Sequence, residues 1–141
     1  CGAYFIANPK TISREIIEAS KKVGKTIVPI RQGYSKCSVA IVSEKAIITS
    51  DHGIARSCKH TDLEILLIEP GHIQLTGYPY GLIGGCCGLI SKQELAFVGQ
   101  LETHPESKRI SAFCHKHGVE VISLCDGPLQ DIGGILPLLE K

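Results

Sequence analysis

Two adjacent cysteines, Cys86 and Cys87, follow the pair Gly84–Gly85 and have the residue types and spacing for nucleophilic chemistry. A thiolate is a nucleophile, and free backbone N–H groups in a glycine-rich loop can stabilise its charge. The two glycines would also let a ligand lie close to the main chain. The alternative is that both cysteines are small residues that fill a tight strand entrance, because free cysteine is among the most buried residue types.

A histidine and a carboxylate could assist such a thiol. His72 lies in a loop after an apolar run, where general acids and bases are common, although a plain surface histidine is an equally simple interpretation. Asp131 stands before Ile-Gly-Gly at 132–134, where Leu82 stands before the same three residues at 83–85. A charge in place of an apolar residue at matching positions is a local inconsistency typical of functional sites.

Four further residues are candidates for contact with a substrate. Glu69 follows an apolar run, and Asp51 lies between a strand and a helix, where its simplest role is that of an N-cap. Cys37 follows Lys36, and a nearby cation lowers the pKa of a thiol, although successive strand residues point to opposite faces. Tyr34 is suited either to stacking on a planar ligand or to filling the core.

The composition is that of a chain that folds around its own core. Of 141 residues, 43% are hydrophobic and 21% are charged, which suits one domain over residues 1–141 and excludes a disordered chain. The net charge is +1, and no basic run is longer than Lys21–Lys22. We therefore expect no nucleic acid and no membrane as partner, since both attract clustered positive charge. A small-molecule substrate is expected instead, and a homo-oligomer is left open.

Cysteine usage and the N-terminus indicate a cytoplasmic protein without a metal. The 7 cysteines are an odd number and include no Cys-x-x-Cys pair, which favours reduced thiols over disulfides or zinc. We expect neither a metal nor a cofactor. Residues 73–91 are uncharged, but glycines and prolines interrupt them, and no export signal is visible. Because the chain starts at Cys1 and contains no methionine, we expect it to be part of a longer protein.

An internal repeat indicates the architecture. Residues 79–85 recur at residues 128–134 with the same proline, isoleucine and two glycines, and the surrounding elements follow one order. The predicted unit is β-β-α-β, and the fold class is α/β, with units over residues 1–32, 33–80, 81–131 and, in part, 132–141. Because such a unit buries its apolar face only against its neighbours, an open array of three should leave an unpaired end.

Apolar patterns and turn residues predict the elements of each unit. Strands are expected over residues 37–42, 46–49 and 64–68 in the middle unit and 87–90, 95–98 and 119–124 in the next. Asp51 should cap the N-terminus of the helix in the middle unit. In the next unit, a capping box of Thr103 and Glu106 should start the helix, and Gly118 should end it. The remaining predictions are strands over 3–7 and 26–30, a helix over 12–23, and a last strand over 132–139.

Five segments resemble a bacterial family of unknown function that is assigned to the pentein fold, also called the guanidino-modifying enzyme fold. These segments, which read RQGYSKC, ITSD, LIEPGHI, GLIGG and DIGG, are residues 31–37, 48–51, 67–73, 81–85 and 131–134. The resemblance covers nearly the whole chain. It implies an α/β propeller that five units close, of which this C-terminal portion holds about three. The last strand would then pair into a first unit that this chain lacks.

The resemblance also implies a chemistry. Penteins that act on guanidines use a cysteine thiolate to attack the guanidino carbon, a histidine as general acid and base, and carboxylates to hold the cationic substrate. These roles would fall on Cys86 or Cys87, His72 and Asp131, although this chain has Gln74 where those enzymes often have an aspartate. Substrate contacts would fall on Glu69, Asp51, Gly84, Gly85, Cys37 and Tyr34.

Two functions follow from these patterns. One is a hydrolase or transferase that acts on a carbon–nitrogen bond of a guanidino or amine compound. The other is a catalytically silent pentein-type binding module. An enzyme of this kind needs an accessible thiol that can ionise, whereas a binding module tolerates buried and inert ones.

Overall fold

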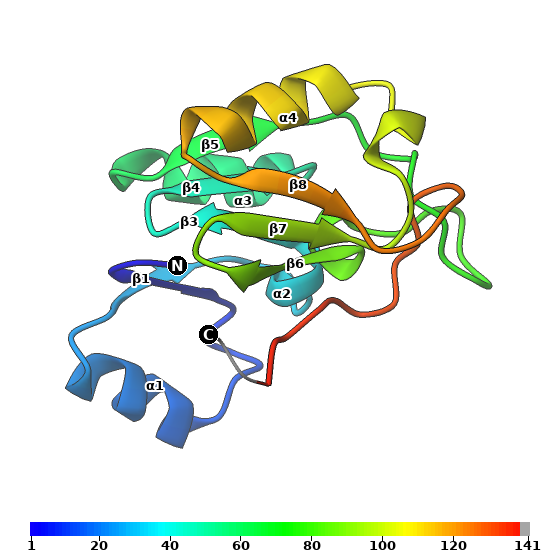
Figure 1. The fold of residues 1–141 in the computed structure, drawn as a ribbon. Coiled ribbons are helices and arrows are strands. Elements are labelled where there is room, and N and C mark those ends of the chain that lie inside the picture. Colours follow the sequence, from blue (N-terminus) through cyan, green and yellow to red (C-terminus); the bar gives the residue numbers. More distant parts are fainter. Residues whose placement is uncertain (139–141) are drawn as a thin grey trace.

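Two three-stranded sheets with the same strand directions form the centre of the computed structural model, which describes residues 1–138 (Figure 1). In the first sheet, β3 (Val39–Ser43) runs antiparallel to β4 (Ala46–Thr49), and β4 runs parallel to β5 (Glu64–Leu67). Parallel neighbours need a crossover connection. Here the crossover holds the helix α3 (His52–Ser57) and a 3₁₀ turn, η1, over Cys58–His60.

The second sheet has the same order of directions. The strand β6 (Cys87–Ser91) runs antiparallel to β7 (Glu94–Phe97), which runs parallel to β8 (Glu120–Ser123). Its crossover holds a 3₁₀ turn, η3 (Leu101–Thr103), and the helix α4 (Ser107–Lys116), which lies along β8 in Figure 1. The fold is therefore a mixed α/β fold with small sheets, as the sequence predicts.

The two hairpin turns use the same local hydrogen bond. Ser43 Oγ accepts the backbone N–H of Lys45 at 3.2 Å, and Ser91 Oγ accepts the backbone N–H of Gln93 at 3.2 Å. A serine that binds the amide two residues later favours a turn. In both hairpins the register also shifts just before this serine, between Ile41 and Ser43 and between Leu89 and Ser91.

The N-terminal part forms a two-stranded parallel sheet. It consists of β1 (Tyr4–Ala7) and β2 (Thr26–Pro29), with α1 (Arg14–Lys22) between them in the sequence. The helix α1 buries none of its residues and stands apart from the sheets in Figure 1. The face that was expected to be buried is exposed to solvent, since Ile16 is 48% exposed and Val23, just after the helix, is 70% exposed.

The core covers both faces of β4. Successive strand residues point to opposite faces, so Ile47 packs with Val28 and Ile54 on one side. Ile48 packs on the other side in the cluster that contains Phe97 of the second sheet. Because both faces are covered, all four residues of β4 are buried, and the strand has no alternating polar pattern.

Several local predictions are confirmed and three are wrong. Asp51 caps α3, since its Oδ1 accepts the Ile54 N–H at 2.7 Å, and Gly118 follows α4 with φ at 70°. The capping box is wrong: α4 begins only at Ser107, and Thr103 Oγ1 instead donates to the carbonyl of Gln100 at 2.7 Å.

The other two corrections concern the starts and ends of units. The strand expected from residue 37 begins at Val39, because Ser35–Ser38 forms a short helix, α2. Residues 132–138 form no strand, and the end of that predicted strand, at residue 139, lies outside the described residues. Among the helices of residues 1–138, none has the length and apolar character needed to cross a membrane.

Candidate functional site

Three segments that are distant in the sequence meet beside the start of β3. They are α2, the 3₁₀ helix η2 (Ile83–Gly85), and the loop after Gln130. Lys36 Nζ donates to the Gly84 carbonyl at 2.9 Å, and the Ile132 N–H donates to the Gly85 carbonyl at 3.0 Å. We call the five residues gathered here the Cys37–Asp131 cluster: Lys36, Cys37, Gly84, Gly85 and Asp131.

Two backbone donors hold the Asp131 carboxylate. Its Oδ2 accepts the N–H of Leu82 at 2.8 Å, and its Oδ1 accepts the N–H of Gly133 at 2.9 Å. The carboxylate occupies the space beside Gly85, where a Cβ atom would overlap it. Hydrogen bonds from two amides fix the orientation of the carboxylate. Gly85 therefore makes room for the acidic group.

Cys37 is the partly exposed thiol of this cluster. Its Sγ lies 3.7 Å from the carbonyl oxygen of Gly133. Burial raises the pKa of the Cys37 thiol, the charge of Asp131 raises it further, and the charge of Lys36 lowers it. In the free protein this thiol is therefore protonated at neutral pH. A cation placed beside Asp131 would oppose the effect of the carboxylate.

Close backbone packing brings Lys36 and η2 together. A Cβ atom on Gly84 would overlap the carbonyl oxygens of Lys36 and Val39, so α2 and η2 approach each other in a way that only glycine allows. The sequence argument against Lys36 assumed a strand, in which neighbouring side chains point apart. Because α2 is helical, that argument does not apply, and Lys36 acts on Cys37.

Cys86 and Cys87 lie in the core. Their exposed fractions are 0% and 1%, and both thiols donate to the carbonyl of Ile83, at 3.2 and 3.1 Å. The neighbouring Cys86 and burial raise the pKa of the Cys87 thiol well above its ordinary value. These are the properties of structural cysteines. Both predicted nucleophiles are therefore buried in this structure, as the alternative of small residues at a strand entrance expects.

His72 lies in the loop that follows β5. It is exposed and packs edge-on against the buried ring of His104, with 5.4 Å between the ring centroids. Within residues 1–138, no hydrogen bond joins His72 to Cys37, Cys86 or Asp131. The structure therefore brings Asp131 to a thiol but does not bring His72 to one.

Comparison with known proteins identifies the family but no activity. The model of a family described as "Family of unknown function (DUF6873)" matches residues 1–136. The chain belongs to this family. No curated protein matches it. Agmatine deiminase from C. jejuni is a similar solved structure, with 13% sequence identity and a TM-score of 0.43; the match covers 87% of this chain and 45% of that chain. The DUF6873 chain therefore spans less than half the length of the deiminase.

The other predicted substrate contacts of this DUF6873 chain lie outside the Cys37–Asp131 cluster. The side chain of Glu69 is exposed, and its backbone N–H donates to the carboxylate of Glu106. Tyr34 is 75% exposed, just before α2. Asp51 caps α3 and also lines a cavity of about 640 Å³ between the end of β2 and α3.

Sequence reasoning missed two groups of residues. The sequence gives no clear role to Lys36, which donates a hydrogen bond to Gly84 in the structure. It indicates Gly133 only as part of the repeat, whereas in the structure the Gly133 carbonyl accepts a hydrogen bond from Cys37. The Gly-Gly pair at 133–134 was the available signal, since it marks a close approach of the backbone. The cavity lined by Arg31 and Arg56 carries no sequence signal, because its two walls are distant in the chain.

Proposed function

We propose that this chain is part of a cysteine-dependent enzyme that acts on a carbon–nitrogen bond of a small guanidino or amidino compound. One observation carries the proposal: the partly exposed thiol of Cys37 lies in the field of both the Asp131 carboxylate and the Lys36 ammonium. A carboxylate held by two backbone amides is a suitable partner for a planar cation. Space remains beside Gly133, because a Cβ atom there would meet no other described atom within 4 Å.

A cationic substrate would itself activate the thiol. In the free protein the charge of Asp131 raises the pKa of Cys37. A guanidinium bound to Asp131 compensates that charge and adds a positive charge beside the sulfur atom. Both effects favour the thiolate, because an opposite charge nearby stabilises the ionised form. The nucleophile then forms only when the substrate is in place.

The reaction balances without a metal or a redox step. The thiolate forms a carbon–sulfur bond at the amidino carbon, and the electron pair of the C=N bond moves to nitrogen. The proton that the thiol releases passes to the leaving nitrogen, ammonia or an amine departs, and an S-amidino cysteine remains. Attack by water on the same carbon gives a ureido product and restores the thiol, which is a hydrolase reaction. Attack by a second amine gives a transferase reaction.

We further propose that the two three-stranded sheets are consecutive units of an α/β propeller, and that β1 and β2 are the parallel pair of a third. Their shared strand directions, matching bulges and serine turns support this proposal. An experimental structure tests it through the rotation that relates each sheet to the next. Equal rotations about one axis support a propeller, and unrelated rotations refute it.

The second candidate function is a binding module without catalysis. The raised pKa of Cys37 favours it, because a protonated thiol is a poor nucleophile. The burial of Cys86 and Cys87 favours it too, since neither thiol is open to a substrate. The two functions differ in whether a cation beside Asp131 makes the Cys37 thiol more reactive.

Two alkylating agents of nearly the same shape distinguish these functions. The cation 2-chloroacetamidine and the neutral 2-chloroacetamide both modify a thiol by displacement of chloride. We would measure both rates at each cysteine of the native protein at neutral pH by peptide mass mapping. The amidine-to-amide rate ratio at Cys37 should exceed that at the exposed Cys125 by about tenfold or more, since a neighbouring charge shifts a pKa by about one to three units.

Cys125 is the internal control, because it reports the intrinsic difference between the two agents. The Asp131→Asn variant should lose the excess ratio at Cys37, since the cation then has no carboxylate to bind. Equal ratios at Cys37 and Cys125 in the wild-type protein would contradict the enzyme proposal and leave the binding module.

A further inference from the structure

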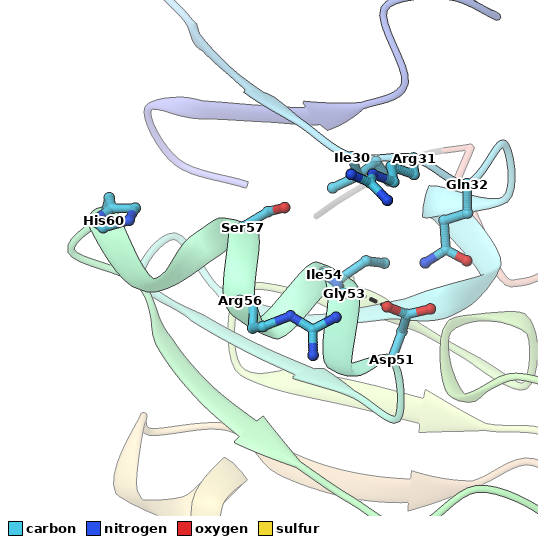
Figure 2. Close-up of a pocket in the computed structure, with 9 residues that line it drawn as sticks. All are labelled: Ile30, Arg31, Gln32, Asp51, Gly53, Ile54, Arg56, Ser57 and His60. Atoms are coloured by element: carbon cyan, nitrogen blue, oxygen red, sulfur yellow. Dashed lines mark hydrogen bonds between the residues drawn. The ribbon is translucent and has the colours of Figure 1, made fainter.

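A second cavity lies apart from the Cys37–Asp131 cluster. It has a volume of about 640 Å³, and its walls are the segment after β2 and the helix α3 with the turn that follows it (Figure 2). Ile30 and Ile54, which are buried, contribute apolar surface. Small-molecule sites have volumes of roughly 300–1,000 Å³ and combine apolar surface with a few polar groups. The cavity therefore has the size and lining of a ligand site.

Positive charge predominates in this cavity. Arg31 comes from the segment after β2 and Arg56 from α3, on two sides of the cavity (Figure 2). Within residues 1–138, neither arginine forms a salt bridge with a carboxylate. The one acidic residue of the lining, Asp51, already accepts the backbone N–H of Ile54 with its Oδ1. Within the described part of the chain, both guanidinium groups are thus without a carboxylate partner.

Gln32 supplies an independent observation. Its amide nitrogen, Nε2, is buried and has no hydrogen-bond partner within residues 1–138. In Figure 2 this nitrogen is on the side of the amide that faces the cavity. Nearly all buried polar groups in proteins are paired, and an unpaired donor calls for an acceptor. A ligand oxygen in the cavity would be that acceptor.

We infer that this cavity binds an oxyanion, the carboxylate or phosphate group of a small molecule, between Arg31 and Arg56 with Gln32 Nε2 as a third donor. A guanidinium presents its N–H groups in a planar fork that matches two oxygens of either anion. The inference goes beyond the proposed function and does not depend on Cys37, because none of these residues belongs to the Cys37–Asp131 cluster.

Calorimetric titration of the full chain with sodium phosphate, and separately with sodium acetate, at constant ionic strength tests the inference. We expect saturable binding of at least one of the two anions. Arg31→Gln and Arg56→Gln should each weaken it by about tenfold or more, because each removes charge-assisted hydrogen bonds. Arg14→Gln is the matched control, since it removes the same charge from the exposed surface of α1 and should leave binding unchanged.

The unliganded variants should unfold at the wild-type temperature, because both arginines are exposed and have no salt bridge within the described part of the chain. Gln32→Leu should also weaken binding, through loss of the third donor. Tighter binding of phosphate identifies a phosphoryl group as the ligand, and tighter binding of acetate identifies a carboxylate. No saturable binding of either anion, or equal weakening by all three arginine variants, would overturn the inference. Cys37→Ser should leave binding unchanged, so the two proposals fail separately.

Discussion

The carboxylate of Asp131 fills the space that a side chain on Gly85 would need. The two residues come from segments that resemble each other in sequence, and the hydrogen bond from Leu82 N–H to Asp131 Oδ2, at 2.8 Å, joins the same segments. The absence of a side chain at one position thus makes room for a charge at the other. This pairing positions Asp131 to act on Cys37.

We predict that Gly85→Ala destabilises the protein by about 1–3 kcal/mol, because the new methyl group displaces the carboxylate from its backbone donors. Urea denaturation measures the loss. Gly33→Ala is the control, since a Cβ atom at Gly33 meets no other atom within 4 Å. The Asp131→Ala variant should reduce the cost of Gly85→Ala in a double-mutant cycle. Additive effects would show that the two sites do not interact.

Two substitutions should move the pKa of Cys37 in opposite directions. Asp131→Asn removes a negative charge that disfavours the thiolate, so the pKa should fall. Lys36→Gln removes a positive charge that favours the thiolate, so the pKa should rise. The pH dependence of alkylation at Cys37 measures both shifts, and Cys125 serves as the reference thiol. Shifts of the same sign in both variants would contradict the described cluster.

Stability should fall as the pH falls below about 6.5, the ordinary pKa of histidine. Burial, and then the charge of His72, lower the pKa of His104 in the folded protein. The unfolded chain therefore binds more protons between the lowered pKa and the ordinary one, and stability decreases as the pH falls through that window. Chemical denaturation at several pH values should show a weaker decrease for His104→Gln. His60→Gln, at an exposed position, should keep the wild-type decrease.

The N-cap of α3 should contribute about 0.5–2 kcal/mol, the usual cost of replacing a capping aspartate with alanine. In Asp51→Ala the Ile54 N–H loses its acceptor, at 2.7 Å in the wild type. The free energy of unfolding measures the effect. Asp62→Ala is the control, because Asp62 is exposed, caps no helix in the described residues, and forms a surface ion pair with Lys45 at 3.6 Å. An equal loss in both variants would assign the effect to charge instead of capping.

Short-range features of the fold were predictable from the sequence. The strands around the Ser43 and Ser91 turns, the Asp51 cap and the end of α4 at Gly118 rest on hydrogen bonds and dihedral preferences within a few residues. Such interactions depend on neighbours that the sequence displays directly. The mixed α/β class followed from the same local patterns.

The capping box at Thr103 shows where local reasoning fails. Glu106 is the partner that Thr103 would need, but its carboxylate binds the backbone N–H of Glu69 and the side chain of Arg109. Glu69 belongs to a segment that is distant in the sequence and reaches Glu106 only in the folded chain. A competing long-range partner thus decided where the helix starts.

The sequence by itself determined which side chains are able to do chemistry, but it predicted a strand where Cys37 lies in the helix α2. Only the tertiary structure decided that Cys86 and Cys87 are buried while Cys37 stays partly exposed beside Asp131. The physical reason is that burial and electrostatic fields depend on segments that pack together from distant parts of the chain.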